Sequence, residues 1–182
     1  TGIFTQTTGI TSFLNTTAGQ SLSASASSYF GNVIINKGAE VLTAASDLDI
    51  NGYVDFTINS ATFDISNRII YVGGSWLLRE GTSFTGTGST VVFDGLSNHT
   101  IRTEGTGTYN NIRFEGNGQS RLYDNVNIPH RALDVNGNLT IDGGFLDAYN
   151  GGWGADIYVA GNWYNSGSFQ HSGLTVYFDG AD

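Results

Sequence analysis

The stretch FTGTGSTVVFDG at residues 84–95 returns as FQHSGLTVYFDG at residues 169–180. A third, more divergent version, FTQTTGITSF, occupies residues 4–13 near the start of the chain. Self-similarity at a long period is typical of proteins that stack one structural unit on the next. A residue that recurs at the same repeat position is therefore expected to serve the scaffold.

The similarity continues between these copies, and the spacing between matching segments drifts only slightly. Residues 29–33 match 108–112, residues 48–52 match 133–137, residues 63–64 match 146–147 and residues 72–76 match 159–163. We therefore divide the chain into repeat 1 (residues 4–83), repeat 2 (residues 84–168) and the first strand of a third repeat (residues 169–182). No proline-rich or charged linker separates the repeats, so we expect one domain over residues 1–182.

Short apolar runs separated by turn residues dominate the chain. Residues 32–36, 68–72 and 111–115 are rich in Val, Ile, Phe and Tyr, and Gly, Asn, Asp and Ser cluster between such runs. Alternation with a period of two, as at Leu133 and Val135, places every second side chain on one face of a strand. The pattern predicts an all-β protein.

Two architectures accommodate these strands. A parallel β-helix, or β-solenoid, coils short strands into rungs that stack about 4.8 Å apart. Two antiparallel β-sandwich repeats are the alternative, and they would usually be joined by a linker. The short strands, the Gly- and Asn-rich turns and the spare terminal strand favour the solenoid.

Composition excludes several functional classes. The chain has no cysteine and no methionine, so disulfides, thiolate metal sites and cysteine nucleophiles are ruled out. Seven basic residues against 16 acidic ones argue against a nucleic-acid partner. No apolar run is long enough for a membrane span. One lysine, no sulfur and abundant Gly, Ser, Thr and Asn are typical of exported proteins, so we expect an extracellular or cell-surface location.

A family resemblance rests on a succession of short motifs. These include VVFDG (residues 91–95), LDVNGNLTI (133–141), VAGNW (159–163) and VYFDG (176–180). As a series they resemble the β-strand repeats of large bacterial surface and adhesin-like proteins. The resemblance implies a β-helix that serves as a spacer, fibre or display scaffold, and it carries over no catalytic residue.

One motif suggests calcium. Asp47, Asp49, Asn51 and Asp55 stand at positions one, three, five and nine of a segment with glycine at position six, as in an EF-hand loop. Position twelve is Ile58 instead of the bidentate glutamate. The alternative is a solvated strand and turn, and we expect no other cofactor.

A second candidate site is aromatic. Trp153 has no counterpart in repeat 1, and together with Tyr149 it offers a platform on which a sugar ring can stack. The alternative is a turn tryptophan folded over the coil. Phe-Asp-Gly at residues 93–95 and 178–180 recurs, which favours a structural role over a glycosidase carboxylate pair: Phe in the core, Asp accepting turn amides and Gly supplying an unusual backbone angle.

Three further sequence patterns give weaker indications of function. The three histidines, His99, His130 and His171, occupy unmatched repeat positions, which disfavours a shared metal site. The threonine-rich residues 82–90 raise an ice-binding hypothesis, but no regular Thr-x-Thr on successive rungs is visible. The Asn-x-Ser/Thr sequons at Asn15, Asn98 and Asn138 matter only where a glycosylation system acts on the chain.

The sequence as a whole predicts a non-enzymatic extracellular structural module, a β-solenoid segment of a surface fibre, filament or adhesin. Its expected partners are copies of itself or flanking repeats, stacked end to end. The alternative is a carbohydrate-binding or polysaccharide-cleaving β-helix with glycans as partners.

Overall fold

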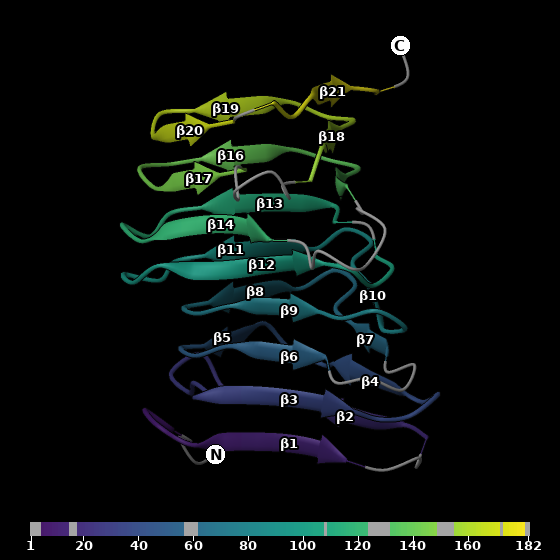
Figure 1. Ribbon diagram of the computed structural model, residues 1–182. Coiled ribbons are helices and arrows are strands. Elements are labelled where there is room, and N and C mark those ends of the chain that lie inside the picture. Colours follow the sequence, from purple (N-terminus) through teal and green to yellow (C-terminus); the bar gives the residue numbers. More distant parts are fainter. Residues whose placement is uncertain are drawn as a thin grey trace.

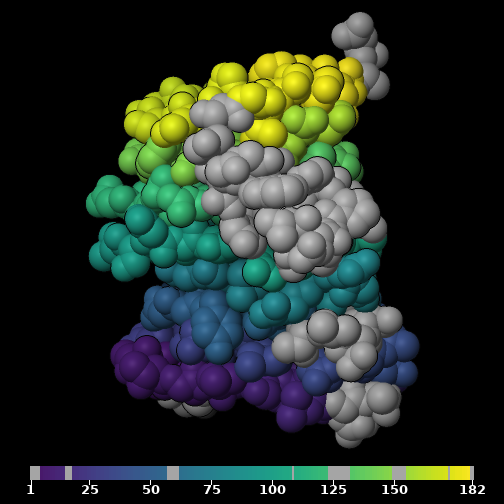
Figure 2. Space-filling model, viewed as in Figure 1, coloured from purple at the N-terminus to yellow at the C-terminus, as the bar shows by residue number. Residues whose placement is uncertain are grey.

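The computed structural model describes residues 5–14, 18–56, 62–107, 109–123, 132–148, 155–171 and 173–180. These residues form a coil of short parallel strands and contain no helix, as Figure 1 shows. Figure 2 shows the described sequence advancing in bands from one end of the coil to the other. The predicted all-β solenoid is confirmed.

The strands stack into four parallel sheets. An eight-stranded sheet contains β1 (Ile10–Leu14), β3 (Asn32–Asn36), β6 (Val54–Phe56), β9 (Trp76–Leu78), β12 (His99–Thr103), β14 (Gln119–Tyr123), β17 (Phe145–Asp147) and β20 (Ser168–Gln170). A six-stranded sheet contains β5 (Leu48–Ile50), β8 (Ile69–Val72), β11 (Thr90–Phe93), β13 (Asn111–Phe114), β16 (Leu139–Ile141) and β19 (Trp163–Asn165).

Two shorter sheets share the third face of the coil, one above the other (Figure 1). The four-stranded sheet contains β2 (Gln20–Leu22), β4 (Val41–Ala44), β7 (Thr62–Asp64) and β10 (Ser83–Thr85). The three-stranded sheet contains β15 (Leu133–Val135), β18 (Ile157–Val159) and β21 (Val176–Phe178). Each turn passes from the six-stranded sheet to the eight-stranded sheet and then to the third face.

Alternating side chains explain why these segments form strands around one core. In β3, Val33 and Ile35 are fully buried and the residues between them are partly exposed. Inward side chains from successive rungs form a single hydrophobic cluster that extends from Leu22 to Val159. All strand pairings are parallel, so the alternative of two antiparallel sandwiches is wrong for the described residues.

The sequence repeat is present in the structure, but it is turned by one face. Strands β3, β6 and β9 lie in the eight-stranded sheet, whereas their sequence copies β13, β16 and β19 lie in the six-stranded sheet. The copies of β5, β8 and β11 are β15, β18 and β21 on the third face. The copies of β4, β7 and β10 are β14, β17 and β20 in the eight-stranded sheet. Every set moves one face backward along the path of the chain.

One sequence repeat therefore makes three full turns of the coil and covers two of the three faces of a fourth turn. Rungs also vary in length: the rung from Ile112 to its partner Leu139 is longer than the rung from Ile157 to its partner Val176. Strand β12 and the segment after it join the two units, which we call unit 1 (β3–β11) and unit 2 (β13–β21). The third sequence copy follows the same rule, because β1, β11 and β21 lie on three different faces.

Tight packing at one corner requires glycine. A Cβ atom added to Gly95 would lie 2.1 Å from the carbonyl oxygen of Gly73 in the rung before, and one added to Gly116 would lie 2.1 Å from that of Gly95. Gly95 does not have a positive φ, so the angle expected from the sequence is wrong. Glycine is needed there because successive backbones approach too closely for a side chain.

Asparagine side chains at the start of β3 and of β13 form hydrogen bonds to the next rung. Asn32 Oδ1 accepts a hydrogen bond from the amide of Tyr53 at 3.1 Å, and Asn111 Oδ1 accepts one from the amide of Asn138 at 2.9 Å. Asn32 and Asn111 are equivalent in the two units. The same bond therefore recurs on different faces of the coil, which supports the one-face rotation.

Candidate functional site

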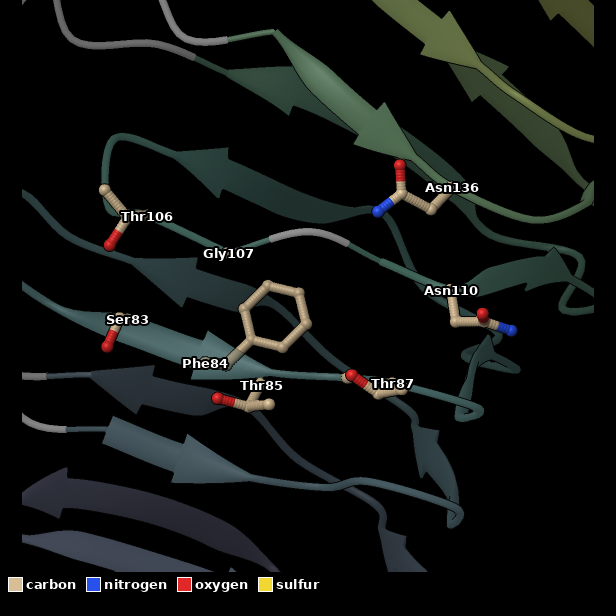
Figure 3. Close-up of a pocket in the computed structure, with 9 residues that line it drawn as sticks. Ser83, Phe84, Thr85, Thr87, Thr106, Gly107, Asn110 and Asn136 are labelled. Carbon is tan, nitrogen blue, oxygen red and sulfur yellow. The ribbon is translucent and has the colours of Figure 1, made fainter. Parts of the chain in front are cut away.

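The two sheets of the third face meet at a seam near the middle of the coil. Thr106 pairs with Ser83 and so extends the four-stranded sheet, and Tyr109 pairs with Val135 and so begins the three-stranded sheet. An open groove of about 460 Å³ lies at this seam (Figure 3). The one-face rotation creates the seam, because unit 2 places the copies of β5, β8 and β11 where unit 1 placed β4, β7 and β10.

Uncharged polar groups line this seam groove. Hydroxyl groups come from Ser83, Thr85, Thr87 and Thr106, and carboxamides come from Asn110 and Asn136. No charged residue is present among the described lining residues. The groove therefore offers hydrogen-bond donors and acceptors but no charged side chain in its described lining, which suits a neutral polar ligand.

The floor of the seam groove is aromatic. Figure 3 shows the Phe84 ring projecting from β10 toward the backbone at Gly107. A Cβ atom at residue 107 would lie 2.3 Å from Phe84 Cδ1, so glycine keeps the ring close to the groove. Beneath it, the Phe84 ring centroid lies 4.6 Å from that of Tyr109 and 5.6 Å from that of Trp76.

Two buried polar atoms in this aromatic cluster lack hydrogen bonds. Neither Trp76 Nε1 nor Tyr109 Oη has a partner within the described residues. Burial raises the pKa of the Tyr109 phenol, so this side chain stays neutral. An unsatisfied buried donor costs about 1–3 kcal/mol, whereas an aromatic pair contributes about 0.5–1.5 kcal/mol beyond its buried area.

A buried Ser–His pair was missed by sequence reasoning. Ser120 Oγ lies 2.7 Å from His99 Nε2, and His99 Nδ1 lies 3.0 Å from the carbonyl oxygen of Ser97. Desolvation by burial is the larger influence on His99 and lowers its pKa. His99 and Ser120 pair directly across one rung. Because rungs differ in length, no fixed spacing in the sequence marks this pairing.

This pair resembles an activated serine only in its distances. His99 is 6% exposed and Ser120 is 2% exposed, and neither lines the seam groove. The His99 ring stacks on Phe93 with centroids 5.7 Å apart. A nucleophile must reach its substrate, so we assign the pair a structural role in the core.

The four calcium candidates are divided between neighbouring sheets. Asp47 Oδ1 accepts a hydrogen bond from the amide of Ile69 at 2.8 Å, Asp49 projects outward from β5, and Asn51 lies in the corner after it. Asp55 lies in β6 and binds Arg79 through both carboxylate oxygens at 2.6 and 2.8 Å. The described residues contain no group of three or more acidic or histidine side chains arranged for a metal. Calcium binding stays a prediction.

The other candidates have separate positions. Trp153, Tyr149 and His130 lie outside the described residues. His99 is buried at the start of β12, between the two units, whereas His171 is exposed beyond β20. Thr82 is buried while Thr85 and Thr87 are exposed, so residues 82–90 form no flat threonine array.

At the C-terminal end of the coil, inward-facing aromatic residues have no rung of described residues above them. The Trp163 and Phe169 rings meet edge to face with centroids 4.9 Å apart, as the equivalent Trp76 and Phe84 rings do in unit 1. Phe178 of β21 is 67% exposed. Within the part of the chain that the structure describes, β19, β20 and β21 each pair on one side only, so this end presents unpaired backbone groups.

Comparisons with protein-family profiles, curated proteins and solved structures find no match. No helix of the described residues has the length and hydropathy to cross a bilayer.

Proposed function

We propose that this protein is a non-enzymatic structural module, a rigid β-solenoid segment that extends a surface fibre, filament or adhesin outside the cell. The observation that carries the proposal is the contrast between a continuous core and an uncapped end. Strands β19–β21 expose aromatic residues that the next rung of the repeat would cover. Coils with capped ends are suited to stand alone, and uncapped ones to continue.

Other features support this proposal. The net charge of −9 disfavours nucleic acid as a partner and keeps the outer faces soluble. The recurrent residues pack the core, form the corners or bond successive rungs, as Phe93, Gly95 and Asn111 do. The partners we propose are further copies of the chain or flanking repeats, added at the ends of the coil.

Sedimentation velocity over a wide range of protein concentration tests this proposal. We expect elongated species whose length grows with concentration, because each added copy covers the apolar end of the one before. A compact monomer at every concentration, with no fibres in electron micrographs, would overturn it.

A second candidate function is glycan binding, and the uncharged seam groove favours it. The described lining contains no carboxylate, so the proposal is binding and not cleavage. Array binding of neutral oligosaccharides should be lost in Asn136→Ala and kept in Asn51→Ala, whose amide lies at a distant corner. Equal binding by both variants would show that the seam groove is not the glycan-binding site.

A further inference from the structure

We propose that copies of this chain join by strand replacement: β21 of one copy displaces β1 of the next and pairs with its β3. This inference rests on the proposed end-to-end association and specifies how the ends fit. It follows from three copies of one strand, β1, β11 and β21. Two of them lie at opposite ends of the coil, as Figure 1 shows.

The interior copy shows how this strand is normally covered. Strand β11 is followed in its sheet by β13, with Val91 opposite Ile112 and Phe93 opposite Phe114. The Phe93 and Phe114 rings stack with centroids 5.3 Å apart, and Phe93 is 1% exposed. Strand β11 therefore packs on β13 through two inward residues, Val91 and Phe93, and we expect the sequence copies of these strands to pair in the same way.

The N-terminal copy obeys the same register. Strand β1 pairs with β3, the unit 1 equivalent of β13, with Thr11 opposite Val33 and Phe13 opposite Ile35. Phe13 is the counterpart of Phe93 in the sequence repeat, and Ile35 is the counterpart of Phe114. The two pairings are thus one interface used twice, in two different sheets.

The third copy carries the same inward pair but lacks a covering strand. Val176 and Phe178 of β21 stand where Val91 and Phe93 stand in β11. In β1 the first of these positions holds Thr11, a polar residue. Strand β21 therefore offers β3 a more apolar partner than β1 does, which favours the exchange.

The exchange fixes the register and orientation of neighbouring copies. Phe178 would lie opposite Ile35, Tyr177 opposite Ile34 and Val176 opposite Val33 of the next copy. Strand β3 belongs to the eight-stranded sheet, so this sheet would stand above the three-stranded sheet of the copy below. Unit 1 of the upper copy would be turned by one face relative to unit 2 of the copy below, as unit 2 is turned relative to unit 1 within one chain.

Cysteine cross-linking of the full chain reads this register directly, because the chain has no cysteine of its own. Tyr177 and Ile34 are outward positions at opposite ends of one molecule, so a disulfide between Tyr177→Cys and Ile34→Cys must join two copies. Adjacent strands lie within the Cα separation that a disulfide spans. We expect ladders of cross-linked copies.

The matched control pair is Ser12→Cys with Gln170→Cys. It reports simple stacking of β20 on an undisplaced β1. Ladders from this pair alone would overturn strand replacement and leave end-to-end association standing. No cross-link from either pair, together with a monomer in sedimentation, would overturn both proposals.

Weakening β1 gives a second test, because the two modes of association predict opposite signs. Under strand replacement, Phe13→Asp tightens self-association about tenfold or more, since β1 becomes easier to displace. Under simple stacking the same variant weakens it. Phe178→Asp should abolish association by replacement, and near-ultraviolet circular dichroism shows whether each variant keeps its core. An unchanged or weakened association in a folded Phe13→Asp protein would contradict the proposal.

Discussion

Phe93 and Phe178 occupy the same position of the sequence repeat, but Phe93 is 1% exposed and Phe178 is 67% exposed. Trp76 and Phe84 are buried as well, whereas their copies Trp163 and Phe169 are only partly buried. The residue types are the same or nearly so in both units. What differs is the rung above: a further described rung covers the aromatic residues of unit 1, and none of the described residues lies above unit 2. In this solenoid, the burial of a side chain thus depends on whether a further rung covers it, and not on the residue type alone.

The largest expected effect separates the two phenylalanines. Phe93→Ala should lower the free energy of unfolding by about 3–5 kcal/mol, because it leaves a cavity between stacked rings. Phe178→Ala should change it by no more than about 0.5 kcal/mol in dilute solution, because the side chain is already hydrated. Urea unfolding of both variants measures the difference, and equal losses would show that the C-terminal rung is covered.

The corner glycines extend the comparison to the backbone. A Cβ atom at Gly95 would lie 2.1 Å from Gly73 O, and one at Gly180 would lie 2.0 Å from Ala160 O. Gly95 is held from both sides by neighbouring rungs, but Gly180 has a rung on one side only and can shift outward. We expect Gly95→Ala to cost about 1–3 kcal/mol and Gly180→Ala much less. Thermal unfolding of the two proteins would contradict this account if the losses were similar.

The buried histidine makes the interior sensitive to acid. The pKa of His99 is lowered by burial, so the unfolded chain binds a proton at higher pH than the folded one. Stability should therefore fall as the pH drops below about 6.5, by at most about 1.4 kcal/mol per pH unit. Melting temperatures from pH 7 down to pH 5.5 measure this fall.

Two variants bracket the effect of His99. His99→Gln should flatten the pH profile of the melting temperature, because the titrating group is gone. His171→Gln, which removes an exposed histidine at the C-terminal end, is the matched control for losing a histidine. A profile that persists in His99→Gln would assign the acid sensitivity to other groups.

The smallest effect concerns Asp55 and calcium. Asp55→Asn breaks the paired hydrogen bonds to Arg79, which are partly exposed, so we expect a loss of about 0.5–1 kcal/mol. Since Arg79 already occupies the Asp55 carboxylate, a calcium chelator should leave the melting temperature unchanged. A drop of several degrees on chelation would instead support the EF-like motif.

Repetition and alternation in the sequence were enough to predict stacked parallel strands. The rotation by one face was hidden, because rungs differ in length, as those from Ile157 to Val176 and from Ile112 to Leu139 do, and no fixed spacing marks a whole turn. The seam groove depends on that rotation, so it could not be predicted either. Its residues, such as Thr106, are ordinary turn residues until the two sheets bring them together.

Hydrogen exchange of β11 and β21 within one sample tests the central claim most directly. In dilute protein, we predict strong protection of the amides of β11, which has neighbours on both sides, and weak protection of those of β21, which has one. At high concentration, β21 should gain protection as further copies cover it. Equal and concentration-independent protection of the two strands would contradict the account.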